Sequence, residues 1–289
     1  MTIIQMPQTN ANLTQEIQHE TTLFAEPLFD FHGFTVTNSL LCSWLAVFLV
    51  VAFSIMARRK IAMIPKGFQN YCEVFLEGAY NLADNVTGGR ERTMKFLPIV
   101  LPLFIFILFN NWLGLLPGFG SIGFVTARES GRFFIPLLRG GTADLNTTLA
   151  LSIMAVVLTH IFGVVMSGAW GHLNRFAGFK FFLELPRKVF KEKKYTALLI
   201  NPIQFFVGLI EAVGEVAKVA SLSFRLFGNV FAGEVLLASM AAIFAYAVPL
   251  PFIFLEIIIG IIQALIFSTL ILVFLSVMSS RHGEEHQII

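Results

Sequence analysis

Five long apolar stretches alternate with polar segments along the chain. Residues 40–57 form an uncharged run of 18 residues, close to the ~20 residues that a helix needs to cross a bilayer. Comparable stretches occupy 96–116, 145–170, 196–246 and 248–280. The fourth would measure ~76 Å as one helix at ~1.5 Å per residue, far more than one perpendicular crossing. Because no proline interrupts residues 203–246, we expect one long, strongly tilted helix there rather than two crossings.

Two connecting segments show patterns of their own. Residues 66–87 repeat apolar side chains at helical spacing, with acidic residues elsewhere, which predicts an amphipathic helix on the inner membrane interface. Residues 117–143 are rich in glycine and cannot span, so we expect an outer loop or hairpin that partly re-enters the interface. Pro98 and Pro102 are expected in the first turns of the second transmembrane helix, where a missing N–H costs least.

These elements predict an all-α integral membrane protein with five transmembrane helices and one interfacial amphipathic helix, the last two transmembrane helices being long and tilted. We expect one polytopic membrane domain over 38–282, an extracytoplasmic segment over 1–37 and a cytoplasmic tail over 283–289. The composition agrees, because 56% of the residues are apolar and 13% are charged, whereas soluble domains carry about 25% charged residues.

Lysine and arginine predict how the chain is oriented. Residues 1–37 contain none, 58–95 contain seven, 117–143 contain three and 171–197 contain seven. Basic loops stay on the cytoplasmic side of a membrane, so the N-terminus is expected outside and the C-terminus inside. Orientation also explains the basic loop 171–197 better than a nucleic-acid partner does.

The fourth apolar stretch carries charges that recur at a helical interval. Glu211, Lys218 and Arg225 are seven residues apart, so they share one face of a helix. Ser221 lies four residues before Arg225 and Asn229 four residues after it, which adds both to the same stripe. Charges in spanning helices cost at least ~2.5–3.5 kcal/mol each on insertion scales, so these residues are functional candidates.

A second polar stripe is expected on the last helix. Glu256 and Gln263 are also seven residues apart, and we expect this stripe to pack against the first. Arginine keeps its proton at any relevant pH, so Arg225 can only be a fixed positive charge. Glu211, Glu234 and Glu256 can take up and release protons, which suits a proton-handling role.

Structural interpretations compete at three other positions. Lys218 can also extend toward the inner interface and keep its charge in water. Glu215 lies near the expected cytoplasmic end of the fourth helix and is interpreted as solvated. His160, on an otherwise apolar helix, is interpreted as a packing residue rather than a ligand.

The sequence 221–235, SLSFRLFGNVFAGEV, resembles the signature of subunit a of F-type ATP synthases, the membrane stator that faces the rotor ring of c subunits. The core of the match, R-L-F-G-N followed by A-G-E, is specific because it sets a charged and an amide residue inside an apolar helix. The resemblance covers nearly all of 38–282 and includes N-P-I-Q at 201–204, Asp144, Asn146 and Thr148 in D-x-N-x-T, N-N-W-L-G-L-L-P at 110–117, and Q-A-L-I-F…L-S at 263–276.

The resemblance implies a role for each polar residue of the two stripes. Arg225 would be the essential arginine facing the ring carboxylates. The outer half-channel would be lined by Asn229, Glu234, Glu256 and Gln263, and the inner one by Glu211 and Ser221. Lys218 is also expected on the proton path. Some members of the family carry a histidine where this chain has Glu234 or Glu256, and two neighbouring carboxyls are expected to couple when they titrate.

The resemblance also implies the setting in which the chain works. It would be a non-catalytic, proton-translocating subunit of the Fo sector, with no cofactor and no metal, in the inner membrane of a bacterial cell. Its partners would be the c-subunit ring, the b subunits of the peripheral stalk, the rest of the Fo–F1 complex and the lipid bilayer.

Two other classes of protein were weighed against this one. A secondary transporter of an anionic solute would use Arg225 to bind its substrate, but such proteins usually show repeated halves, and no repeat is visible in the sequence. The tail H-G-E-E-H at 282–286 fits the H-x-x-E-H spacing of some zinc peptidases, but it has no evident third ligand. No P-loop motif ending in G-K-[ST] is present, which leaves direct nucleotide binding unsupported.

Overall fold

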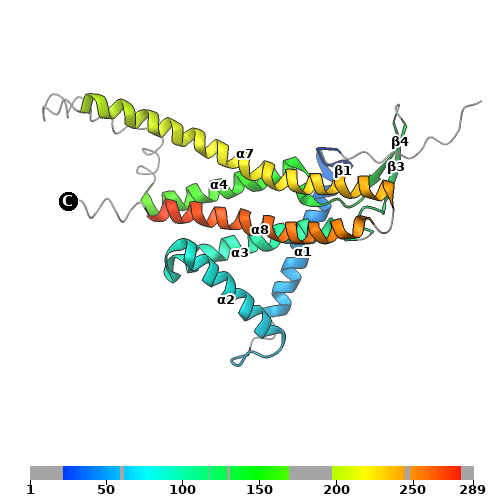
Figure 1. Cartoon of the computed structure of the whole chain (residues 1–289), viewed down its shortest axis with the longest axis horizontal. Coiled ribbons are helices and arrows are strands. Elements are labelled where there is room, and N and C mark those ends of the chain that lie inside the picture. The colour runs from blue at the N-terminus through cyan, green and yellow to red at the C-terminus, as the bar shows by residue number, and fades with distance from the viewer. Residues whose placement is uncertain are drawn as a thin grey trace, which may run out of the picture.

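Six α-helices and two small hairpins make up the described part of the chain (Figure 1). The computed structural model describes residues 22–58, 62–116, 118–128, 131–168, 197–244 and 248–280. The predicted tail motif at 282–286 and nearly all of the basic loop at 171–197 lie outside these residues.

Five of the described helices are long and apolar enough to cross a membrane. They are α1 (Asn38–Arg58), α3 (Arg90–Leu113), α4 (Leu145–Ser167), α7 (Ala197–Ile243) and α8 (Pro249–Ser280). The predicted all-α membrane fold with five spans is therefore confirmed. The fourth apolar stretch forms one continuous helix of 47 residues, α7, as the absence of proline from residues 203–246 indicated.

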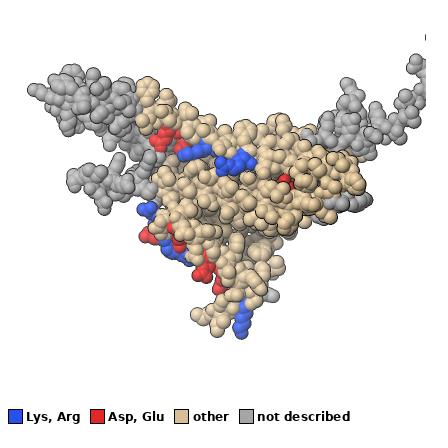
Figure 2. All heavy atoms as spheres, in the orientation of Figure 1, with Lys and Arg blue, Asp and Glu red and all other residues tan. Residues whose placement is uncertain are grey.

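Helix α2 (Phe68–Thr87) is the predicted amphipathic helix. It ends at Gly88, which has a left-handed φ of 75° and donates its N–H to the Asp84 carbonyl, a C-cap that glycine adopts without strain. Arg90, just past this corner, pairs with the Asp84 carboxylate at 3.0 Å. Figure 2 shows charged side chains along the α2 side of the molecule and a second row of them over α7, with uncharged residues between the two.

The start of α3 differs from the expected position. The helix begins at Arg90, so Pro98 and Pro102 lie in its interior rather than in its first turns. The apolar run alone suggested a later start, but charged residues extend the helix by almost two turns, including the Glu91–Lys95 pair at 2.9 Å. The first turns of a membrane helix that reach into water follow helix propensity, not hydrophobicity.

Two β-hairpins lie toward one end of the helices (Figure 1). Strands β3 (Gly123–Arg128) and β4 (Gly131–Pro136) form an antiparallel pair, so of the two alternatives expected between the second and third spans, a loop or a hairpin, the chain forms the hairpin. Strands β1 (Pro27–Phe31) and β2 (Phe34–Thr37) form a second pair, in a segment for which the sequence analysis predicted no element.

The buried core joins α3, α4, α7 and α8. Its fully buried side chains include Phe96 and Ile107 of α3, Leu226 of α7 and Ile271 of α8. In Figure 1 these four helices run lengthwise, whereas α1 crosses them at a steep angle. This packing sets the polar positions of α7 beside the first turns of α8 and the end of α3.

Candidate functional site

A cavity of about 200 Å³ lies at the hairpin end of the helices. Its lining includes Asn229 and Glu234 of α7, Glu256 of α8 and Asn111 of α3. Three predicted site residues therefore meet at one cavity: Asn229 and Glu256 from the polar stripes, and Glu234 from the family resemblance. Gln263, Glu211, Ser221, Lys218 and Arg225 are not among its described lining residues.

Glu256 enters this cavity against the backbone of α7. The residue is 8% exposed, and its carboxyl group packs on Gly233. A Cβ on Gly233 would lie 2.5 Å from Glu256 Oε1 and 2.6 Å from Oε2, which no real side-chain contact tolerates. The glycine of the A-G-E sequence thus leaves the space that the end of the Glu256 side chain occupies beside α7. The two polar stripes meet at this cavity through Asn229 and Glu256, whereas Arg225 does not line it.

Amide groups line the same cavity. The Nδ2 of Asn229 is buried without a hydrogen-bond acceptor among the described residues. Asn111, at the end of α3, donates from Nδ2 to the Gly260 carbonyl at 3.2 Å and accepts from the Thr142 hydroxyl at 2.7 Å. Asn111 thereby joins α3, α8 and the loop before α4, and it holds the cavity wall in place.

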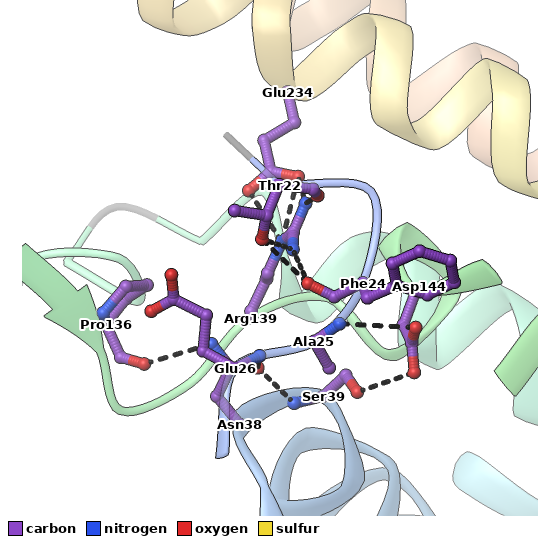
Figure 3. Close-up of polar contacts among 10 residues, drawn as sticks. All are labelled: Thr22, Phe24, Ala25, Glu26, Asn38, Ser39, Pro136, Arg139, Asp144 and Glu234. Carbon is purple, nitrogen blue, oxygen red and sulfur yellow. Dashed lines mark hydrogen bonds and ion pairs between the residues drawn. The ribbon is translucent and has the colours of Figure 1, made fainter. Parts of the chain in front are cut away.

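Arg139 is the functional candidate that sequence reasoning missed. It lies between β4 and the 3₁₀ turn η1 (Gly141–Ala143), and its guanidinium meets the Glu234 carboxylate, with Nη2–Oε2 at 2.8 Å and Nε–Oε1 at 3.0 Å (Figure 3). A carboxylate inside an apolar helix, such as Glu234, needs a positively charged partner. The outer segment 117–143 offers only three basic residues, and Arg139 is one of them.

The N-terminal segment is held against the same loop. Asp144, the N-cap of α4, accepts from the Asn146 N–H at 3.2 Å. It also accepts from the Ala25 N–H at 3.3 Å and the Ser39 hydroxyl at 3.2 Å (Figure 3). Asn38 adds a bond from Nδ2 to the Pro136 carbonyl at 3.3 Å. The D-x-N-x-T sequence thus caps a helix and also ties the segment before α1 to the cavity loop.

Arg225 lies one helical turn before Asn229 on α7, and Glu234 lies five residues after Asn229. Its side chain is exposed, and no described residue gives it a hydrogen bond or an ion pair. The flanking residues Leu222, Ser223 and Leu226 are buried, so α7 turns its packed face inward and presents Arg225 outward, beside the exposed Phe224. The spacing prediction for Arg225 and Asn229 needed only one unbroken helix, which α7 provides.

A second polar cluster lies farther toward the start of α7. Glu215 Oε1 accepts from Lys218 Nζ at 2.7 Å, and Oε2 lies 3.5 Å from His160 Nε2 of α4. The Glu215 side chain is only 11% exposed, so its interpretation as solvated was wrong, because α4 covers this face of α7. Lys218 is held between Glu215 and the Phe274 ring, 4.7 Å from the ring centroid. The Glu211 and His160 side chains are half-buried, and Ser221 is exposed.

The chain matches the family described as "ATP synthase A chain" over residues 40–276. It is 32% identical to the ATP synthase subunit a of Syntrophobacter fumaroxidans over 244 residues, which cover 83% of each chain. It is also 32% identical to the ATP synthase subunit a of Campylobacter jejuni subsp. doylei, over 80% of this chain and 85% of that one. A Geobacter relative of the same name is 31% identical over 82% of this chain and 86% of its own.

The family match includes the three middle spans and nearly all of the first and last, together with the residues that line the shared cavity and Arg225. Relatives of this similarity cover more than two thirds of the chain. The chain therefore belongs to the ATP synthase A chain family.

Proposed function

We propose that this chain is the proton-translocating stator subunit of an F-type ATP synthase, with two offset half-channels and Arg225 between them. The observation that carries the proposal is the cavity shared by Asn229, Glu234 and Glu256, one helical turn from an exposed arginine. The cavity is lined by carboxyl groups that can bind and release protons. The exposed surface of α7 carries Arg225, a permanent cation with no described partner in its own chain.

The outer half-channel is the cavity at the hairpin end. A proton enters along Asn229, Glu234, Glu256 and Gln263 and is passed to a carboxylate of the c ring. Asn229 suits this path because its buried Nδ2 has no described acceptor and can donate to a passing group. Once protonated, the ring carboxyl is neutral and can face lipid at low cost.

The inner half-channel lies toward the start of α7. Glu211 receives the proton there after the ring has turned, on a path lined by Ser221 and Lys218. The ion pair of Lys218 with Glu215 at 2.7 Å keeps a fixed polar patch on that side, because a buried charge needs a partner. A membrane potential adds about 2.3 kcal/mol per charge per 100 mV to this transfer.

Arg225 separates the two half-channels. It keeps its proton at any relevant pH, so it takes no part in the relay. An ionised ring carboxylate that meets Arg225 is stabilised by an ion pair, which favours release of its proton on the inner side. The same charge repels a proton that would otherwise pass directly from one half-channel to the other.

The setting follows from the same proposal. The exposed apolar side chains around Arg225 and farther back on α7, among them Phe224, Val213 and Val216, would be covered by the c ring and lipid. The b subunits of the peripheral stalk and the rest of the Fo–F1 complex would complete the assembly in a bacterial inner membrane, with the N-terminus outside. This chain makes and breaks no covalent bond in ATP synthesis; that chemistry belongs to the soluble sector.

Arg225→Ala tests the proposal. The variant is assembled in the whole complex in inverted membrane vesicles, and ATP-driven acidification is followed with a pH-sensitive dye. We expect acidification to fall to the background of vesicles without the complex, and an imposed proton gradient to decay faster. Arg92→Ala is the matched control, since it removes the same charge from an exposed position at the start of α3 and should pump normally. Acidification by Arg225→Ala at the rate of the unchanged complex would refute the proposal.

A further inference from the structure

The cavity holds two carboxyl groups in unlike surroundings. Glu234 and Glu256 both line it, and the sequence alone treats them as an equivalent pair. In the structure their oxygens differ completely in what they contact. That difference assigns each of them a separate task.

Glu234 is fully engaged by one arginine. Arg139 Nε lies 3.0 Å from Oε1 and 3.1 Å from Oε2, and Nη2 lies 2.8 Å from Oε2. Such a forked pair is among the strong charge-assisted contacts. The Arg139 side chain is 6% exposed and always charged, and among the described residues Glu234 is the carboxylate that pairs with it. A buried cation needs its counter-charge, and the Glu234 carboxylate supplies it to Arg139.

The remaining donors of Arg139 bind the N-terminal segment. Nη2 donates to the Thr22 carbonyl at 2.8 Å, and Nη1 donates to the Phe24 carbonyl at 3.2 Å and to the Thr22 hydroxyl at 3.4 Å (Figure 3). One guanidinium therefore joins three parts of the chain: the segment before β1, the loop after β4, and α7. Withdrawal of Glu234 from this arrangement would leave a buried charge on the cavity wall.

Glu256 has the opposite surroundings. It is buried against Gly233, and no described residue donates a hydrogen bond to it or pairs with it. Both of its oxygens remain available to a proton that moves through the cavity, whereas those of Glu234 are occupied by Arg139.

We propose that Arg139 is a positioning residue that holds Glu234 in a permanent ion pair, which leaves Glu256 as the carboxyl of the cavity that exchanges protons. This inference rests on the proposed function. Within its outer half-channel, the Arg139–Glu234 pair is fixed in place, and Glu256 takes up and releases the proton. Glu234 shapes the charge of the cavity without carrying the proton itself.

The test is a set of charge-neutralising variants in the whole complex, measured by ATP-driven acidification of membrane vesicles. Arg139→Gln leaves Glu234 without its cation, and Glu234→Gln leaves Arg139 without its anion. We expect each to lower the acidification rate by about tenfold, since removing one partner of this part-buried pair leaves an uncompensated charge. Arg139→Lys keeps the charge and should retain more activity than Arg139→Gln.

The double variant Arg139→Gln with Glu234→Gln separates charge pairing from mere structural support. Two neutral amides need no counter-charge, so we expect its rate to recover to within about threefold of the unchanged complex. Adding Glu256→Gln to this double variant should abolish acidification. Immunoblots of the membranes report whether each variant assembles. If Arg139→Gln fails to assemble but the double variant assembles and pumps, that result also supports the pairing.

Three results would overturn the inference. They are an Arg139→Gln variant that pumps at the unchanged rate, a double variant that assembles or pumps no better than Arg139→Gln, and a triple variant that still pumps. Arg225→Ala in the double-variant background tells this failure apart from a failure of the proposed function, because continued pumping there would refute the two half-channels themselves.

Discussion

Gly233→Ala is expected to disturb the cavity through a single methyl group. The added Cβ would lie 2.5 Å from Glu256 Oε1, and an ordinary contact begins at 3.4 Å. The carboxyl group must therefore retreat by about 0.9 Å, or α7 and α8 must separate. Because the cavity on the other side has room, with a volume of about 200 Å³, we expect the Glu256 side chain to move rather than the helices.

The energetic balance of this substitution has two parts. Alanine gains about 1 kcal/mol over glycine inside a helix, and overpacking a tight contact costs about 1–3 kcal/mol. Gly233→Ala should therefore destabilise the chain by between about 0 and 2 kcal/mol. Gly214→Ala is the matched control on the same helix, since its Cβ would meet nothing within 4 Å. It should be neutral or stabilising by up to about 1 kcal/mol.

The effect on transport should be larger than the effect on stability. A displacement of about 1 Å in a group that must meet a reacting partner can lower a rate by about 100-fold, so we expect ATP-driven acidification to fall at least about tenfold in Gly233→Ala and to stay unchanged in Gly214→Ala. Glu256→Asp, which is one methylene shorter, should restore part of the rate when it is combined with Gly233→Ala. Unchanged acidification in Gly233→Ala, or a double variant that pumps no better than either single variant, would refute the reasoning.

Two further substitutions test the supports of the cavity. Asp144→Ala removes the cap of α4 and the acceptor for the Ala25 N–H; it should lower stability by about 1–2 kcal/mol and speed proteolysis of the N-terminal segment, whereas Asp144→Asn, which keeps a capping oxygen, should show less of both. Asn111→Ala removes the buried bonds to Gly260 and Thr142; each deleted partner costs about 1–3 kcal/mol, so the melting temperature of the detergent-purified chain should fall, and an unchanged value would show that these bonds do not hold α3 to α8.

The parts of the fold that depend on one helix at a time were predictable from the sequence. The length of each apolar run predicted the five spans, and the unbroken run after Pro202 predicted α7 as one helix. The same spacing predicted that Asn229 follows Arg225 by one turn. The start of α3 was misplaced because hydrophobicity measures the membrane core and not the charged turns outside it.

Contacts between distant segments were not predictable in this way. Arg139 and Glu234 are 95 residues apart, and periodicity within one helix contains no information about a loop that folds over it. Glu215 seemed solvated because its own helix does not show that α4 covers it. The first hairpin did leave a local signal in the sequence, Gly33 between two apolar segments. In the structure His32 and Gly33 form its turn, both with positive φ, as the common type I′ hairpin turn requires.

The continuity of α7 has a geometrical consequence for the whole subunit. Because the helix is unbroken from Ala197 to Ile243, the positions of its residues are related by a rise of about 1.5 Å and a rotation of about 100° per residue. Glu211 lies about 21 Å along it from Arg225, and Asn229 about 6 Å beyond. An insertion or deletion of one residue between them would turn one end through about 100° relative to the other, so selection on this stretch must preserve length as strictly as residue identity.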